Sequence, residues 1–263
     1  MPELPDVEVF RRYLQSTSLK RRIRNVRVSR PGDMLEGVSR RRLVDELTGS
    51  RLTTTRRHGK YLFARASSGG WLVLHFGMTG FLDLGKTDEL TEHWRLVLEF
   101  SRGYRLCYDC RRLLGRVSFT GDPDSFIQDL DLGPDALSDA LDRERFEEQV
   151  IQRRGMAKPT LMNQSIVAGI GNVYSDEILF HARIHPRKRL RELGNRRRSK
   201  LYRETGRVLR KAIECRAQPD EMPRSWLTPC RGRDGTCPAC GGRLKRLTVS
   251  GRTAYVCPNR QRN

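Results

Sequence analysis

The stretch that decides the fold is LMNQSIVAGIGNVY, residues 161–174. It joins two apolar segments of helical spacing through the turn Gly169-Ile170-Gly171-Asn172. Glycines in such a turn let backbone N–H groups approach a phosphate closely, and the N-terminus of the following helix adds a favourable dipole. Taken alone, a Gly-x-Gly-Asn turn between helices is more often ordinary helix-turn-helix packing. Its meaning therefore depends on the rest of the chain.

The chain on either side of this turn divides into a strand-rich first half and a helical second half. Short apolar runs occupy residues 23 to about 119 and are separated by turn signals such as Ser68-Gly69-Gly70. These runs predict an antiparallel sandwich or barrel. Leu132-Gly133-Pro134-Asp135 marks a boundary, after which helical spacing dominates to about residue 216.

The two ends of the chain add a helix and a cysteine-bearing tail. Val7, Phe10 and Leu14 recur at helical spacing behind a proline suited to a first turn, which predicts an N-terminal helix. The tail is Gly-rich and too short to form a core of its own. We therefore predict an α+β fold with an N-terminal helix and an antiparallel sandwich or barrel over residues 1–131, a helical domain over 132–228 and a cysteine-bearing tail over 229–263.

The charge of the chain points to a polyanionic partner. It carries 51 Lys and Arg against 31 Asp and Glu, a formal net charge of +20, and its pI is about 10.4. No run of 18 apolar residues is present, and the first twenty residues contain acids and prolines in place of a signal-peptide core. We expect a soluble, intracellular protein that binds nucleic acid and no membrane.

The N-terminus offers a candidate nucleophile. Removal of Met1 would leave the secondary amine of Pro2 free, with the carboxylate of Glu3 beside it. An α-amino group has a pKa near 8, so an appreciable fraction is neutral at physiological pH. A secondary amine attacking an aldehyde-like carbon gives an iminium ion, which is a strong electron sink. Most chains that begin Met-Pro have no such function, so the assignment needs partners elsewhere.

Six ordered motifs supply those partners, and through them the chain resembles the formamidopyrimidine-DNA glycosylase and endonuclease VIII family. The resemblance extends over essentially the whole length. The motifs are Pro2 to Glu8, His58-Gly59-Lys60-Tyr61-Leu62, His75 to Gly80, Asp109 to Gly115, Gly169 to Asn172, and the C-terminal cysteine-bearing hairpin.

The resemblance implies a β-sandwich, a helix-two-turn-helix domain and a zinc-finger-like hairpin. It implies a base-excision repair DNA glycosylase with AP lyase activity by β/δ-elimination, acting through an N-terminal proline Schiff base. Pro2, Glu3 and Lys60 take the catalytic positions. The implied partner is damaged double-stranded DNA, bound by a monomer in the cytoplasm or nucleoid. The alternative is a catalytically silent nucleic-acid-binding protein of the same fold, but pure binding gives no reason to keep these three residues together.

Further residues match the DNA-contacting positions of the family. Lys158, Asn172 and Arg252 match residues that hold phosphates around the flipped nucleotide. Glu177 aligns with a helix-borne carboxylate of the family and is equally compatible with a capping or salt-bridge role. When the damaged base is flipped out, side chains must fill the space that it leaves in the duplex. The resemblance implies that Met78, Arg111 and Leu113 form this wedge. Family members of the glycosylase branch usually have an aromatic residue where this chain has Leu113.

Two departures from the family pattern bear on substrate and cofactor. Members that excise 8-oxoguanine usually carry a long Gly-rich loop before the finger, whereas this chain has only residues 215–225 there. Oxidised pyrimidines, hydantoins and abasic sites are therefore the expected substrates, which places the chain nearer to the endonuclease VIII-like side.

The second departure is a missing cysteine in the finger. Cys237 and Cys240 form one Cys-x-x-Cys knuckle, but the second knuckle keeps only Cys257, with Arg260 in place of its partner. Arginine does not bind zinc, so Cys230 is the nearest candidate for a fourth ligand. Two interpretations stay open, a four-thiolate zinc site and a hairpin that folds without metal.

Overall fold

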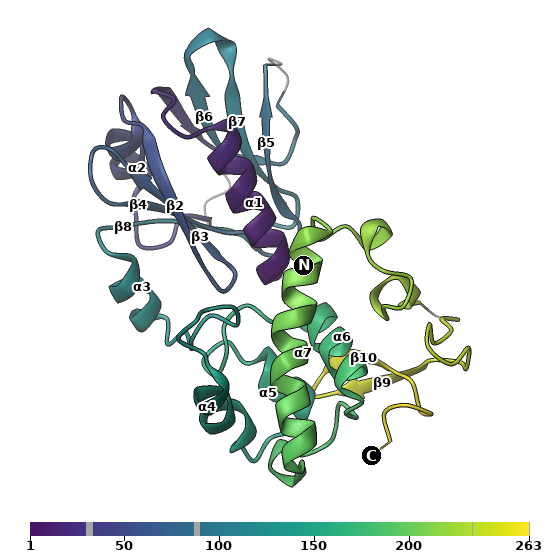
Figure 1. Cartoon of the computed structure of the whole chain (residues 1–263). Helices are drawn as coiled ribbons and strands as arrows, with labels where there is room; N and C mark the ends of the chain where they lie inside the picture. Colours follow the sequence, from purple (N-terminus) through teal and green to yellow (C-terminus); the bar gives the residue numbers. More distant parts are fainter. Residues whose placement is uncertain (30–33, 87–89, 233, 263) are drawn as a thin grey trace. The chain divides into compact units, whose positions relative to one another are not determined.

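The structure, a computed structural model, describes residues 1–29, 34–86, 90–232 and 234–262 (Figure 1). It contains two compact units. The first comprises Met1–Pro2 and Asp6–Leu130, and the second comprises Glu3–Pro5 and Asp131–Asn263. Each is described by itself below.

The helices and strands follow the predicted division between a β-rich and a helical half. The helices are α1 (Leu4–Thr17), α2 (Arg40–Leu47), α3 (Pro123–Asp129), α4 (Arg143–Phe146), α5 (Ala157–Met162), α6 (Asn172–Ala182) and α7 (Asn195–Glu214). The strands are β1 (Ile23–Val28), β2 (Leu52–His58), β3 (Tyr61–Ala66), β4 (Trp71–His75), β5 (Gly80–Gly85), β6 (Trp94–Phe100), β7 (Arg105–Cys110), β8 (Arg116–Thr120), β9 (Lys245–Val249) and β10 (Arg252–Val256).

The first unit is the predicted β-sandwich. Its sheets have the strand orders β1-β6-β7-β5 and β2-β3-β4-β8, and every neighbouring pair is antiparallel. One apolar core contains inward side chains of both sheets together with Val7 and Leu14 of α1. Both of these side chains are fully buried, and each such burial contributes about 1.5–3 kcal/mol. The helical spacing at the N-terminus is thus explained by packing onto the sandwich.

Some elements of the first unit gave no clear signal in the sequence. Strand β2 reads LTTTRRH, and only Leu52 at its start is fully buried, so no alternation of apolar residues marks it. Helix α2 opens with three arginines and buries only Leu43 and Leu47, and Ser39 caps it by accepting a hydrogen bond from the Arg42 N–H. Contacts with neighbouring elements therefore stabilise β2 and α2 more than an apolar pattern of their own does.

The second unit is helical and ends in the β9–β10 hairpin. Helices α5, α6 and α7 pack around a core that includes Leu161, Ile178, Leu209 and the fully buried Trp226. Strand β10 lies against α6, and Figure 1 shows the yellow hairpin beside that helix. None of the helices among the described residues combines the length and apolar composition needed to cross a membrane.

A buried carboxylate ties α1 to the sandwich. Glu8 accepts hydrogen bonds from Arg11 at 2.7 Å and Arg12 at 3.0 Å on its own helix, and from Arg57 of β2 at 3.3 Å. Burial opposes its ionisation, but these arginines outweigh that effect and lower the pKa of Glu8 to about 2. Because the ordinary value is 4.5, the folded state favours the charged form.

We expect Glu8→Gln to destabilise the first unit by about 2–3 kcal/mol at pH 7. Since the folded-state pKa lies below the unfolded one, this contribution is complete above about pH 5 and disappears as the pH falls towards 2. Urea unfolding of wild type and variant between pH 7 and pH 2.5 measures the difference. Glu99→Gln is the control, because Glu99 pairs with Arg27 and Arg105 only at 3.7 and 3.8 Å on the surface. A difference that stays constant with pH would contradict the assignment.

Candidate active site and DNA-contacting surface

Glu3 lies at the N-terminus of α6 within the second unit. Its carboxylate accepts hydrogen bonds from the backbone N–H groups of Gly171 at 2.7 Å, Val173 at 2.7 Å and Tyr174 at 3.2 Å. The side chain is only 1% exposed. Three amide donors and the positive end of the helix dipole both favour a negative charge at this point. The carboxylate therefore has one fixed position.

The glycine turn before α6 makes room for this arrangement. A Cβ on Gly171 would lie 2.4 Å from the Glu3 carboxyl carbon, and one on Gly169 would lie 2.6 Å from the Leu4 side chain. Gly169 also has a φ of +111°, a conformation that L side chains rarely adopt. The sequence predicted that these amides would hold an anion such as a phosphate. In the structure the anion they hold is the chain's own Glu3 carboxylate.

Asn172 and Lys158 lie side by side at the same helix end, in different roles. The Lys158 ammonium is buried and donates to the Asn172 carbonyl at 3.0 Å, to Ser175 at 3.2 Å and to Asp176 at 2.6 Å. Burial lowers the pKa of Lys158, and Asp176 opposes that shift. Such a lysine supports the turn from inside, which differs from the direct phosphate contact predicted for it. Asn172 is half-buried, and its side-chain oxygen has no hydrogen-bond partner among the described residues.

Pro2 and Lys60 belong to the first unit. Pro2 is half-buried and lies two residues before the start of α1 at Leu4, while Lys60 occupies the tight turn between β2 and β3. His75 faces the same turn, since it pairs with Tyr61 and its ring lies 4.8 Å from the Tyr61 ring. Burial, with the charges of Lys60 and Arg116, lowers the pKa of His75 to about 4. His75 is therefore neutral at pH 7, and the positive charge near this turn comes from Lys60, from Arg116 and from Arg57, which donates to the Gly59 carbonyl at 3.2 Å.

The predicted wedge residues are exposed on two loops that contact one another. Met78 is 37% and Leu113 42% exposed, and Arg111 is also exposed. The loops interlock, because the Arg112 N–H donates to the Thr79 hydroxyl at 3.1 Å and Gly77 packs on the Leu114–Gly115 backbone. The sequence interpretation missed Leu114, which is the most exposed of these apolar side chains at 48%. Two adjacent exposed leucines were the signal that could have found it.

Arg252 opens β10 directly after the Ser250-Gly251 hairpin turn. Both turn residues have positive φ, 46° and 73°, which is typical of a two-residue hairpin connection. Arg252 is exposed and borders a surface hollow of about 230 Å³ in the second unit. The hollow is lined by Pro159, Met162, Asn163, Val249, Ser250 and Arg252. The hairpin thus brings a guanidinium group beside the end of α5.

Comparison with known proteins gives the family directly. Residues 1–117 match the formamidopyrimidine-DNA glycosylase N-terminal domain, and residues 132–221 match the formamidopyrimidine-DNA glycosylase H2TH domain. A formamidopyrimidine-DNA glycosylase of Thermus thermophilus is 35% identical, over 99% of this chain and 98% of the relative. The enzyme of the same name from Geobacter metallireducens is 34% identical, over 99% of this chain and 100% of its own length.

Solved structures agree with these relatives. The Lactococcus lactis enzyme of the same name, bound non-covalently to DNA that contains an AP site, is similar with a TM-score of 0.90 and 28% identity, covering 99% of this chain and 100% of that one. Its complex with DNA containing FAPY-dG gives a TM-score of 0.89 at 28% identity, with the same coverage of both chains.

The chain belongs to the formamidopyrimidine-DNA glycosylase family. The predicted class of activity, a base-excision repair DNA glycosylase with AP lyase activity, is thereby confirmed. The predicted fold is confirmed as well, with its sandwich, helix-two-turn-helix segment and cysteine-bearing hairpin.

Glu177 of this glycosylase fold has a structural position. It is fully buried, and its carboxylate accepts from the backbone N–H groups of Leu227 at 3.0 Å and Thr228 at 2.7 Å, and from the Thr228 hydroxyl at 2.6 Å. It therefore ties α6 to the segment that leads into the finger. Its carboxylate also lies 2.8 Å from His181 Nε2 on the same helix, so the contacts match both the capping and the salt-bridge role that the sequence left open.

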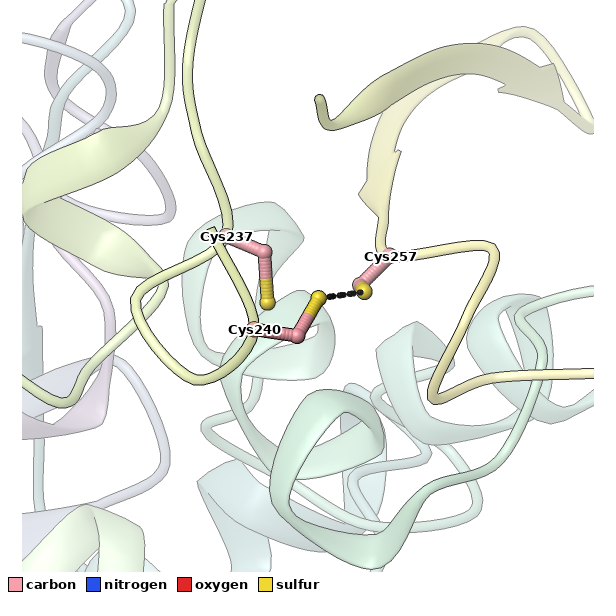
Figure 2. A group of neighbouring side chains, drawn as sticks. All are labelled: Cys237, Cys240 and Cys257. Atoms are coloured by element: carbon pink, nitrogen blue, oxygen red, sulfur yellow. Dashed lines mark hydrogen bonds between the residues drawn. The ribbon is translucent and has the colours of Figure 1, made fainter. Parts of the chain in front are cut away.

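The finger contains one cluster of potential metal ligands among the residues that the structure describes. The sulfur atoms of Cys237, Cys240 and Cys257 all lie within 4.8 Å of one another, and those of Cys240 and Cys257 are 3.5 Å apart. Figure 2 shows the three side chains converging on one point. Two thiolates bound tetrahedrally to one zinc ion would lie about 3.8 Å apart, so this donor set fits a thiophilic metal.

Cys230, the predicted fourth ligand, is not a member of this cluster. It lies in the short turn Thr228–Cys230, and it packs against the apolar core of the finger together with Tyr255. The turn is held by Glu177 through Thr228. The apolar core that Cys230 contacts includes Cys237 and Cys257, but the Cys230 sulfur is not one of the three that lie within 4.8 Å of one another. Among the described residues the cluster therefore has three thiols, and the four-thiolate arrangement that the sequence left open is not formed there.

We expect Gly171→Ala to displace Glu3, because the added methyl group would overlap the Glu3 carboxyl carbon. Base excision should slow by about 10²–10⁴-fold, the usual contribution of a positioned acid or base, while DNA affinity changes little. Single-turnover excision and equilibrium binding on the same duplex separate the two effects. Gly121→Ala is the matched control, since its Cβ would meet open space. A Gly171→Ala enzyme with the wild-type excision rate would show that the position of Glu3 is unimportant.

Proposed function

We propose that this enzyme removes oxidised bases from duplex DNA with the Pro2 amine as nucleophile and Glu3 as the acid and base. The observation that carries the proposal is the Glu3 carboxylate, which three backbone amides fix at a helix N-terminus while it directly follows Pro2 in the chain. A carboxylate that only stabilised the fold would not need to adjoin an N-terminal secondary amine. Pairing a nucleophile with a positioned proton carrier is the usual design of covalent catalysis.

The chemistry follows from these two groups. The Pro2 nitrogen forms a bond to C1′ of the damaged nucleotide as the glycosidic bond breaks, and the base leaves with the bonding electron pair and a proton. Opening of the sugar then gives an iminium ion between Pro2 and C1′. Loss of a proton from C2′ expels the 3′ phosphate by β-elimination, and a second elimination expels the 5′ phosphate. Glu3 transfers protons during sugar opening and elimination.

The phosphates beside the lesion are held by Lys60, Asn172 and Arg252 in this proposal. Lys60 contributes positive charge at the β2–β3 turn, and Asn172, half-buried at the start of α6, would donate to a phosphate oxygen through its side-chain NH2. Arg252 projects from an exposed hairpin end. Lys158 contributes indirectly, since it holds the Asn172 carbonyl from inside the protein. The net charge of +20 adds long-range attraction to the backbone.

The exposed wedge fills the space of the flipped base. Met78, Arg111 and Leu113 stand on two loops that are locked to each other, and Leu114 adds a fourth side chain. Apolar side chains inserted between base steps compensate the loss of stacking, and an arginine adds hydrogen bonds to the orphaned partner base. Aliphatic side chains stack on bases less well than an aromatic ring does, so this wedge fills the space mainly by the volume of its side chains.

The lesion class follows from the short segment between α7 and the finger. Residues 215–225 are pinned to the core of the second unit by buried Cys215 and Met222, with Trp226 directly after them. Backbone hydrogen bonds from Ala217 to Ala212 and from Met222 to Pro219 close two tight turns. Such a segment has no free length to fold over a purine. We therefore propose oxidised pyrimidines, hydantoins and abasic sites as substrates, as in the endonuclease VIII-like branch.

The finger is proposed to hold one structural zinc ion through Cys237, Cys240 and Cys257, where its bound charge would fix the two knuckles against each other. The functional division proposed is residues 1–131 for the catalytic sandwich, 132–228 for the helix-two-turn-helix domain and 229–263 for the finger. We further propose that the enzyme acts on damaged double-stranded DNA as a monomer inside the cell.

An uncleaved N-terminal tag should abolish the covalent intermediate, because acylation removes the nucleophilic lone pair of Pro2. Borohydride trapping on abasic-site DNA measures the intermediate, and enzyme from the same tag after proteolytic release of Pro2 is the control. Pro2→Gly keeps an amine and should retain part of the trapping. A borohydride-stable adduct of undiminished yield from the blocked protein would assign the nucleophile to a lysine. Absence of trapping in every form would instead favour a catalytically silent DNA-binding protein.

Excision of 5-hydroxyuracil or thymine glycol should be faster than excision of 8-oxoguanine opposite cytosine, since no long loop covers a flipped purine. Single-turnover rates on duplexes that differ only in the lesion give the comparison. Duplexes with a preformed abasic site serve as the control, because they report the lyase step alone. A faster rate on 8-oxoguanine would mean that another segment recognises the purine.

A further inference from the structure

The metal-binding end of the finger has three protein ligands and a substituted fourth position. In the part of the chain that the structure describes, the cluster consists of Cys237, Cys240 and Cys257 alone. Cys237 and Cys257 are buried, while Cys240 is exposed, so the cluster opens to solvent on one side. Figure 2 shows that the three sulfur atoms face a common point.

Arg260 occupies the position from which a second knuckle would supply its other cysteine. Its guanidinium group stacks on the Phe180 ring, 5.3 Å from the ring centroid, and is therefore directed to the α6 side of the hairpin. The local turn is nevertheless a complete knuckle, since the N–H groups of Arg260 and Gln261 donate to the Cys257 carbonyl at 3.1 and 2.9 Å. The backbone at position 260 thus has the geometry of a metal-ligand position, but the arginine side chain there does not bind metal.

The neighbouring residues do not complete the set. Gln261 is buried and fully engaged, since its side-chain oxygen accepts from the Cys257 N–H at 3.0 Å and its amide donates to the Ile184 carbonyl at 2.9 Å. Cys230 packs against the apolar cluster that contains Cys237 and Cys257, but its sulfur lies outside the group of three that converge. Asn259 contacts Cys240 at 3.7 Å, but an amide is a poor zinc ligand beside thiolates.

We propose that this finger holds zinc through three thiolates and leaves the fourth coordination position to a small ligand from solution, such as water or a free thiol. The proposal rests on the proposed zinc ion and goes beyond it, because the family expectation is a closed four-cysteine site. Three protein ligands with an open position make a zinc ion exchangeable and reactive, whereas four make it inert. Arg260 is the single residue that keeps the position open.

Cobalt spectroscopy on the full chain tests the open position. Metal-free protein is titrated with Co²⁺, whose visible bands report coordination number and ligand type, and 2-mercaptoethanol or imidazole is then added. The bands of the wild type should shift on addition of either ligand. Bands that form but do not shift would show a closed site, and the absence of Co²⁺ and Zn²⁺ binding would show a hairpin without metal. Both outcomes overturn the proposal.

Arg260→Cys is the matched variant, since it restores a thiol at a position whose backbone already has the knuckle geometry. Its cobalt bands should no longer respond to added ligands. Its zinc affinity, measured by chelator competition, should rise on the order of 100-fold, because one ligand carries about a quarter of the binding free energy of a four-ligand site. Arg260→Ala removes the cation without adding a ligand and should keep the response of the wild type. An unchanged zinc affinity in Arg260→Cys would contradict the proposal.

Cys230→Ser and Cys257→Ser complete the design. Cys230→Ser should keep the wild-type bands and their shift, whereas Cys257→Ser should lose the thiolate bands. Loss of the bands in Cys230→Ser would instead identify Cys230 as the fourth ligand. Borohydride trapping of the same wild-type preparation reports the proposed glycosylase chemistry separately, so failure of the metal proposal and failure of the catalytic proposal are distinguishable.

Discussion

The position of the Glu3 carboxylate at the N-terminus of α6 is the constraint on which the rest of the active site depends. The carboxylate and the three amides of Gly171, Val173 and Tyr174 satisfy each other, so neither is left buried without a partner. This single interaction explains why Glu3 and a turn almost 170 residues later in the chain must be compatible. It also explains Gly171, because any side chain there would occupy the space of Glu3.

A second set of buried charges extends from that helix to the finger. Asp176 receives Lys158 on one oxygen, and on the other it receives Arg231 at 3.2 Å and the Tyr255 N–H at 3.1 Å. Burial of such charges is costly unless every partner is present. One face of α6 thus organises the glycine turn that holds Glu3 and the hairpin that carries Arg252, through hydrogen bonds and ion pairs of protein groups.

Much of the fold was accessible from the sequence, because apolar spacing reports which face of an element is buried. Val7 and Leu14 marked α1, and the apolar runs marked β1, β3, β4, β6 and β7. The polar strand β2 and the arginine-rich α2 were missed, since pairing with neighbours stabilises them and leaves little apolar pattern. In the candidate site, residue type and order pointed to Pro2 and Glu3, and the family resemblance pointed to Lys60. The burial of Lys158 and its contact with Asp176 were visible only in the structure.

The sequence by itself determined the chemistry available to this protein: an N-terminal secondary amine next to a carboxylate, a basic chain, a glycine turn before a helix and three cysteines in a short tail. These are properties of residue type and order, and they do not depend on packing. Only the tertiary structure decided which anion the glycine turn holds, which side Lys158 faces and which cysteines converge. Those outcomes depend on which groups far apart in the chain come within hydrogen-bond distance, and spacing along the chain does not contain that information.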